Sequence, residues 1–280
     1  MSTRTQRPGS GVSAEVVKMQ EVSRLVAETL AEVSQRLVQI ESSLDSLRTD
    51  VAATQRLQKH LYMIQRRDLS HALDVDALTS SARFIRDHLP TTPRFPHAYE
   101  TLRHAARLAT VPGLVLEFGV ATGTTLRILA EELPERSIFG FDAFTGLPED
   151  WRTGFTAGTF AQEPPDVPGA QLVVGLFEDT VPDFAAEHPE PISLLHLDAD
   201  LYSSTATVLE HVGPHLVDGS VVVFDEYLNY PGWENHEHKA WQEYVDRTGT
   251  QFSYEGYTAN GEQLAIRVTH PGDPDRHRGQ

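Results

Sequence analysis

From residue 12 to residue 89 the chain contains neither glycine nor proline, the two residues that most disfavour an uninterrupted helix. Within this span apolar side chains recur at alternating spacings of four and three residues, which is the pattern of a heptad repeat. We therefore expect a helical coiled-coil region over residues 12–89 that joins copies of the chain into a homo-oligomer. The alternative is a single helix lying on its own domain. The heptad positions are Val26, Leu30, Val33, Leu37, Ile40, Leu44, Leu47 and Val51.

The segments that flank this region are rich in residues that stop regular structure. Residues 1–11 are polar and contain Pro8, Gly9 and Gly11, and residues 271–280 combine prolines with charges. Both segments are predicted to be disordered tails. Three prolines between residues 90 and 96 end the helical region. The folded domain is thus expected to occupy residues 90–270.

Within that domain, continuous apolar runs alternate with helical patterns. Apolar runs that do not alternate with polar residues are typical of strands buried on both faces, as in a parallel sheet covered by helices. The last two runs are separated by a turn that contains Asn260 and Gly261 and form an antiparallel hairpin. The fold is therefore predicted to be α/β. Strands are expected at 114–120, 137–143, 171–175, 192–198, 220–226, 251–257 and 262–268, and helices at 124–133, 203–216 and 235–247.

Composition excludes several classes of protein. The chain has no cysteine, which rules out a disulfide framework, a thiolate zinc site and a cysteine nucleophile. No apolar run reaches the length of about 18 residues that a membrane span requires, and no secretory signal is recognisable at the N-terminus. These features predict a cytoplasmic protein without a membrane partner.

The charge is unevenly distributed. Residues 1–111 hold 15 Lys and Arg against 12 Asp and Glu, whereas residues 112–280 hold 8 against 28. Nucleic-acid binding normally requires a basic surface. A nucleic-acid partner is therefore not expected.

A glycine-containing turn follows the first apolar run of the domain and opens a helix. Its sequence, Glu117-Phe-Gly119-Val-Ala-Thr-Gly123-Thr124, places two glycines where a ligand can approach the backbone closely and where free amides of a helix N-terminus face it. Ala121 breaks the Gly-x-Gly-x-x-Gly fingerprint of dinucleotide-binding proteins. A nucleoside-type cofactor other than a dinucleotide is the better prediction for Glu117, Gly119, Gly123 and Thr124.

Three further strand ends carry acidic residues. Asp142 ends the second apolar run, where a carboxylate can accept both hydroxyls of a ribose. Asp198 ends the fourth run, and Asp225 and Glu226 end the fifth. Carboxylates on neighbouring strand ends can share one hard divalent cation such as Mg²⁺. The alternative for Asp142, Asp200 and Asp225 is that each caps the helix that follows it.

Five segments in this order resemble the sugar O-methyltransferases of the macrocin and mycinamicin type, from about residue 101 to residue 268. The segments are LEFGVATGTT, FGFDAFTGLPED, VGLFEDTVPDF, LHLDADLYSST and VVVFDEY. The resemblance implies a class I S-adenosylmethionine (SAM) methyltransferase fold, SAM and Mg²⁺ as cofactors, and a sugar or glycosylated natural product as acceptor. By position, Asp198 is similar to the family's metal-bound aspartate and general base. Asp225 and Glu226 match its acidic pair, although the best-known members have Asp where this chain has Glu226.

Two other functions stay open on the sequence. One is a NAD(P)-dependent oxidoreductase built on a similar sheet, which the missing third glycine disfavours. The other is a coiled-coil assembly protein with an inactive methyltransferase domain, against which the full set of strand-end acids argues. The expected SAM-binding residues are Glu117, Gly119, Gly123, Thr124 and Asp142, the expected metal ligands are Asp198, Asp225 and Glu226, and the expected catalytic residue is Asp198.

Overall fold

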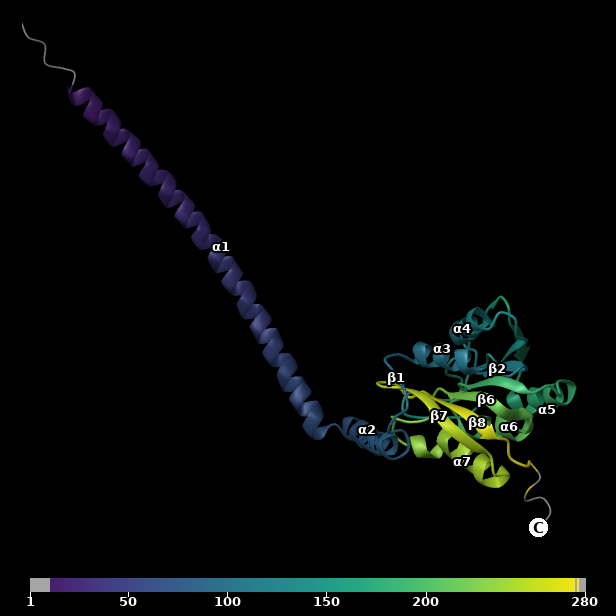
Figure 1. Cartoon of the computed structure of the whole chain (residues 1–280). Helices are drawn as coiled ribbons and strands as arrows, with labels where there is room; N and C mark the ends of the chain where they lie inside the picture. The colour runs from purple at the N-terminus through teal and green to yellow at the C-terminus, as the bar shows by residue number, and fades with distance from the viewer. Residues whose placement is uncertain (1–10, 275, 277–280) are drawn as a thin grey trace, which may run out of the picture. The chain divides into compact units, whose positions relative to one another are not determined.

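A computed structural model describes residues 11–274 and 276, with side chains from residue 15 onward. The chain divides into two compact units, Met1–Leu69 and Ser70–Gln280. In the first unit the described residues form helix α1, Gly11–Arg67 (Figure 1). Every heptad side chain from Val26 to Val51 is 48–62% exposed in the single chain. Of the tail expected over residues 1–11, only Gly11 is among the described residues, and it begins α1.

Helix α2, Leu69–His88, shows that the region expected to be one helix over residues 12–89 is two. The helices are separated at Asp68, whose backbone N–H still donates to the carbonyl of Ile64 at 3.0 Å. No glycine or proline marks the break, so the sequence pattern gave no signal for it. The side chain of Ser80 on α2 accepts a hydrogen bond from Trp233 Nε1 at 3.0 Å, and the ring of Phe84 packs edge-on against Trp233. This helix is therefore part of the second unit.

The second unit is built on a mixed sheet, which confirms the predicted fold class. Among the described residues the sheet has eight strands in the order β1-β7-β8-β6-β5-β2-β3-β4. The five strands from β6 to β4 are parallel, and β8 runs antiparallel to both β6 and β7. The strands are β1 Arg94–Phe95, β2 Leu114–Phe118, β3 Ile138–Asp142, β4 Gln171–Val174, β5 Ile192–Leu197, β6 Leu216–Phe224, β7 Gln251–Thr258 and β8 Leu264–His270.

Helices cover both faces of this sheet (Figure 1). Helices α3 and α4 pack with one set of strand side chains, which includes Val115, and helices α5, α6 and α7 pack with the alternate set, which includes Leu116 and Phe118. This burial on both faces is the reason for the continuous apolar runs in the sequence. The helices are α3 Ala98–Leu108, α4 Thr124–Glu132, α5 Phe177–Glu187, α6 Tyr202–Val212 and α7 Glu237–Thr248.

Several boundaries differ from the sequence pattern. The helix expected over 203–216 ends at Val212, because a 3-10 turn at Gly213–His215 carries Pro214 and β6 begins immediately after it. The helix expected from residue 235 begins at Glu237, after a 3-10 turn at Trp233–Asn235. Strand β1 and helices α3 and α5 were not anticipated. In the part of the chain that the structure describes, no helix is both long and apolar enough to cross a membrane.

Candidate functional site

A cavity of about 660 Å³ opens at the carboxyl ends of the parallel strands, the edge of an open α/β sheet at which ligands bind. Its lining comes from the loops after β2, β3, β4, β5 and β6, and from residues 146–160. Four residues predicted from the sequence lie on its wall, namely Gly119, Asp142, Asp198 and Glu226. The other predicted residues, Glu117, Gly123, Thr124 and Asp225, are not among the lining residues.

The turn after β2 depends on Gly119. Its φ is +95°, and a Cβ atom there would lie 1.7 Å from the carbonyl oxygen of Asp198. The backbones after β2 and β5 thus approach as closely as only glycine permits. Gly123, with φ +74°, begins α4 as its N-cap, so the free amides of that helix lie next to the turn.

Asp142, at the end of β3, holds this turn in place. One carboxylate oxygen, Oδ2, accepts hydrogen bonds from the backbone N–H groups of Val120 at 3.0 Å and Ala121 at 2.8 Å. The other, Oδ1, accepts from Phe144 N–H at 2.7 Å. Asp142 therefore both holds the turn after β2 and lines the cavity.

Glu117 is buried beneath the cavity wall and does not line the cavity itself. Its side chain is completely buried. One carboxylate oxygen accepts a hydrogen bond from the Thr125 hydroxyl at 3.1 Å, and the other lies 2.9 Å from His196 Nδ1. Burial raises the pKa of Glu117, although the bond to His196 acts in the opposite direction.

His196 continues this buried chain toward Asp225. Its Nε2 atom lies 3.8 Å from Asp225 Oδ1, and Gln263 Nε2 donates to Asp225 Oδ2 at 3.2 Å. Burial alone would lower the pKa of His196, but the carboxylates of Asp225 and Glu117 outweigh it, so the pKa lies well above its ordinary value. Burial acts to raise the pKa of Asp225, yet the interaction with His196 brings it below its usual range.

Two acids after β5 have raised pKa values. For Asp198 the cause is burial, followed by repulsion from Asp225, and the pKa lies well above the ordinary range. For Asp200 burial raises the pKa to about 7, partly offset by Arg152. Raised carboxyl pKa values that cluster in a cavity are typical of functional sites.

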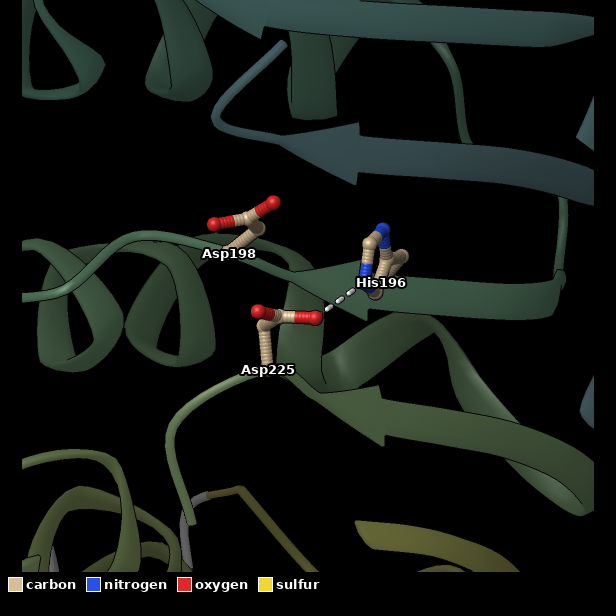
Figure 2. A group of neighbouring side chains, drawn as sticks. All are labelled: His196, Asp198 and Asp225. Atoms are coloured by element: carbon tan, nitrogen blue, oxygen red, sulfur yellow. Dashed lines mark ion pairs between the residues drawn. The ribbon is translucent and has the colours of Figure 1, made fainter. Parts of the chain in front are cut away.

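Three side chains bring metal-binding atoms together. Ligand atoms of His196, Asp198 and Asp225 all lie within 4.8 Å of one another, and Figure 2 shows the Asp225 carboxylate directed at the His196 ring, with Asp198 beside them. Among the described residues, Glu226 does not join this group. Its side chain is 7% exposed, and its Oε2 atom has no hydrogen-bond partner.

Glu237, the first residue of α7, connects the loop after β5 to the loop after β6. Its carboxylate accepts a hydrogen bond from the backbone N–H of Glu226 at 3.0 Å, and the N–H of Ala199 lies 3.5 Å from its other oxygen. The side chain is completely buried. It therefore fixes the backbone beside both Asp198 and Asp225. No sequence signal points to this role of Glu237, because it lies 11 residues from Glu226 and 38 from Ala199.

The part of the cavity wall formed by residues 146–160 contains aromatic rings and one arginine. Arg152 lies over the ring of Trp151 at 3.9 Å and pairs with Glu262 at 3.1 Å. Among the described residues that line the cavity, Arg152 is the one Lys or Arg, against six Asp and Glu. Because Arg152 is already paired, the cavity is acidic overall.

Comparison with known proteins relates the strands around this cavity to one class of domain. Residues 116–227 match the family model described as a methyltransferase domain. The matched segment runs from β2 through Tyr227 and contains Asp142, Asp198, Asp225 and Glu226. It thus spans the strand ends that build the site. No curated protein is significantly similar to the chain.

Solved structures of methyltransferases share the fold of the second unit. The calicheamicin methyltransferase CalS11 is 26% identical, with a TM-score of 0.50 over 78% of this chain and 92% of that one. The O-methyltransferase NovP is 21% identical, with a TM-score of 0.49 over 61% of this chain and 79% of that one. The family-model match and the CalS11 structure support the predicted methyltransferase fold with a Rossmann-like sheet.

Proposed function

We propose that the protein is a SAM-dependent O-methyltransferase that acts on a hydroxyl group of a sugar or glycosylated small molecule. The observation that carries this proposal is that one cavity holds both Asp142, at the end of β3, and Asp198, at the end of β5. The first is suited to a cofactor ribose and the second to proton transfer. The match to a methyltransferase domain over the same strands supports it.

The turn after β2 and the Asp142 carboxylate would bind SAM. Each oxygen of Asp142 is oriented by backbone N–H groups, and an ionised carboxylate has enough lone pairs to accept ribose hydroxyls as well. Gly119 leaves the backbone accessible from the cavity. In this proposal Glu117 does not contact SAM but holds Thr125 and His196 in place. Gly123 and Thr124 contribute by forming the N-terminus of α4 next to the cofactor.

Asp198 would act as the general base. SAM held at the turn after β2 would supply the methyl group to the acceptor oxygen, and Asp198 would receive the proton of the acceptor hydroxyl. A carboxylate with a raised pKa is the stronger proton acceptor once it is ionised. A divalent cation bound beside it would lower the pKa of the acceptor hydroxyl, and the convergence of Asp198 and Asp225 fits such an ion.

The character of the cavity favours an acceptor without negative charge. Its carboxylates outnumber its single arginine, which is paired with Glu262, so an anionic group would be repelled. The rings of Trp151, Phe155 and Phe160 offer apolar faces suited to the carbon skeleton of a sugar. CalS11 is described as a TDP-rhamnose 3'-O-methyltransferase, and here we propose an uncharged glycoside instead.

The exposed heptad positions of α1 support a homo-oligomer. Eight apolar side chains along one helix remain about half exposed, and burying such a stripe against a second copy is the usual way to remove it from water. In a parallel arrangement Arg36, at a g position, would face Glu41 of the next copy, at an e position, an attractive pair.

Calorimetric titration of the full chain with SAM and, separately, with NADH tests the cofactor. Transfer of a labelled methyl group from SAM to a panel of neutral glycosides then tests the reaction. We expect SAM to bind and NADH to give no heat. NADH binding without SAM binding would exclude the proposed methyl transfer and favour an oxidoreductase.

A further inference from the structure

The pairing of the central strands decides which strand-end acids share a face of the sheet. Glu117 on β2 is the register partner of His196 on β5, and His196 is the partner of Val223 on β6. Side chains two residues apart on a strand point to the same face. Asp198 lies two residues after His196, and Asp225 lies two residues after Val223. If the alternation continues past the strand ends, both acids lie on the same face of the sheet as His196.

The same alternation directs Glu226 away from that face. Its backbone N–H is bonded to Glu237 of α7, a helix that packs on the opposite face of the sheet from α3 and α4. The group of converging ligand atoms accordingly contains His196 and excludes Glu226 within the described residues. Of the acidic pair adjacent in sequence, only Asp225 belongs to this group, although the Glu226 carboxyl still interacts with that of Asp225.

Only one ring nitrogen of His196, Nδ1, lies within hydrogen-bond distance of a carboxylate. Nδ1 lies 2.9 Å from the carboxylate of Glu117, which can only accept when ionised, so Nδ1 carries the proton of that bond. Nε2 faces Asp225 Oδ1 at 3.8 Å, too far for a hydrogen bond. Two ligand atoms at about 2.0–2.2 Å from one ion can lie up to about 4.3 Å apart, so this separation fits a shared ion.

We propose that His196 Nε2, together with the carboxylates of Asp198 and Asp225, forms a divalent metal site whose imidazole ligand favours a first-row transition ion such as Mn²⁺ over Mg²⁺. Glu117 then serves as the carboxylate behind the ligating histidine, an arrangement that fixes the tautomer and ring orientation in many metal sites. The Nε2 lone pair is used for the metal, and any proton held there passes to solvent on binding.

Metal preference follows from the donor set. Mg²⁺ takes oxygen ligands almost exclusively and keeps much of its hydration shell, whereas affinity at sites with nitrogen donors rises along the first-row transition series. Glu226 is left outside the site with an unpartnered, buried Oε2. Because Glu226 also lines the cavity, its carboxylate is available to a hydroxyl of the acceptor. The inference builds on the proposed function but concerns ion binding alone.

The test is electron spin-echo spectroscopy of Mn²⁺ bound to the full-length chain. Directly coordinated imidazole nitrogen modulates the echo, and growth on ¹⁵N-labelled histidine must change that modulation. We expect nitrogen coupling in the natural protein, and at least tenfold tighter binding of Mn²⁺ than of Mg²⁺ by calorimetry. Bound Mn²⁺ without histidine coupling, or no Mn²⁺ binding at all, would overturn the proposal.

Two variants separate the candidate third ligands. His196→Gln should lose the nitrogen coupling and at least tenfold in Mn²⁺ affinity, while Glu226→Gln should keep both. The reverse result would assign the third ligand to Glu226. If His196→Gln does not fold, the labelled natural protein still decides the question. Failure of SAM binding with an intact Mn²⁺ signal would count against the methyltransferase proposal and leave the metal site standing.

Discussion

A Cβ atom added to Gly119 would lie 1.7 Å from the backbone oxygen of Asp198, so the cofactor turn and the proposed catalytic loop touch through their backbones. Gly119→Ala should therefore lower the free energy of unfolding by about 2–5 kcal/mol, because it combines a positive φ with steric overlap. It should also abolish SAM binding. Gly154→Ala is the matched control, since Gly154 has φ +92° but no atom within 4 Å of its added Cβ. Equal losses in the two variants, measured by denaturant unfolding, would show that the close approach is unimportant.

Asp142→Ala should weaken SAM binding by about 1.5–3 kcal/mol, the usual cost of losing hydrogen bonds to a charged group. The carboxylate also orients the turn after β2, so part of the loss comes through the backbone. Calorimetry on a variant with a native circular dichroism spectrum measures it. Unchanged affinity would remove Asp142 from the SAM site.

Asp198→Asn keeps the shape of the side chain and removes its charge. Turnover should fall by about 100-fold or more, the range expected for a lost general base, while SAM affinity stays within about twofold of the natural protein. Methyl transfer from labelled SAM gives both values. EDTA should also lower turnover, and added Mn²⁺ should restore it. Natural turnover in the variant would mean that the base lies elsewhere.

Asp200 provides a prediction about pH. Its pKa is raised to about 7 by burial, so the folded state binds its proton more tightly than the unfolded chain does. The stability contributed by that proton is complete below about pH 4 and is lost progressively as the pH rises to about 7. Asp200→Asn should therefore be more stable than the natural protein at pH 8, and this advantage should shrink at pH 5. Asp218→Asn removes the same charge from an exposed position near the start of β6 and is the matched control for urea unfolding.

Deleting residues 1–66 should convert an oligomer into a smaller assembly or a monomer with a folded methyltransferase domain, because the second compact unit begins at Ser70. In the full chain, Leu37→Glu with Leu44→Glu should have the same effect on the mass measured by light scattering. Val38→Glu is the control, because Val38 is 65% exposed but lies off the heptad stripe. An unchanged mass after the deletion would disprove the coiled coil.

The strand-end acids could be located from the sequence because each follows an apolar run that only a buried strand explains. The role of His196 could not, although it lies two residues before Asp198. Both faces of β5 are buried, so no alternation of polar and apolar residues shows which face a side chain occupies. Glu237 was missed for another reason: its hydrogen bonds join loops distant in sequence, and only the tertiary structure brings them together.

The buried carboxylate of Glu237 accepts hydrogen bonds from the N–H groups of Ala199 and Glu226. The segment over residues 146–160 is held by a different contact, the ion pair between Arg152 and Glu262 in the β7–β8 turn. The residues proposed to react and the residues proposed to contact the acceptor are thus held in place by separate sets of contacts. Substitutions within residues 146–160 can therefore alter the proposed acceptor surface without breaking the Glu237 hydrogen bonds beside Asp198 and Asp225.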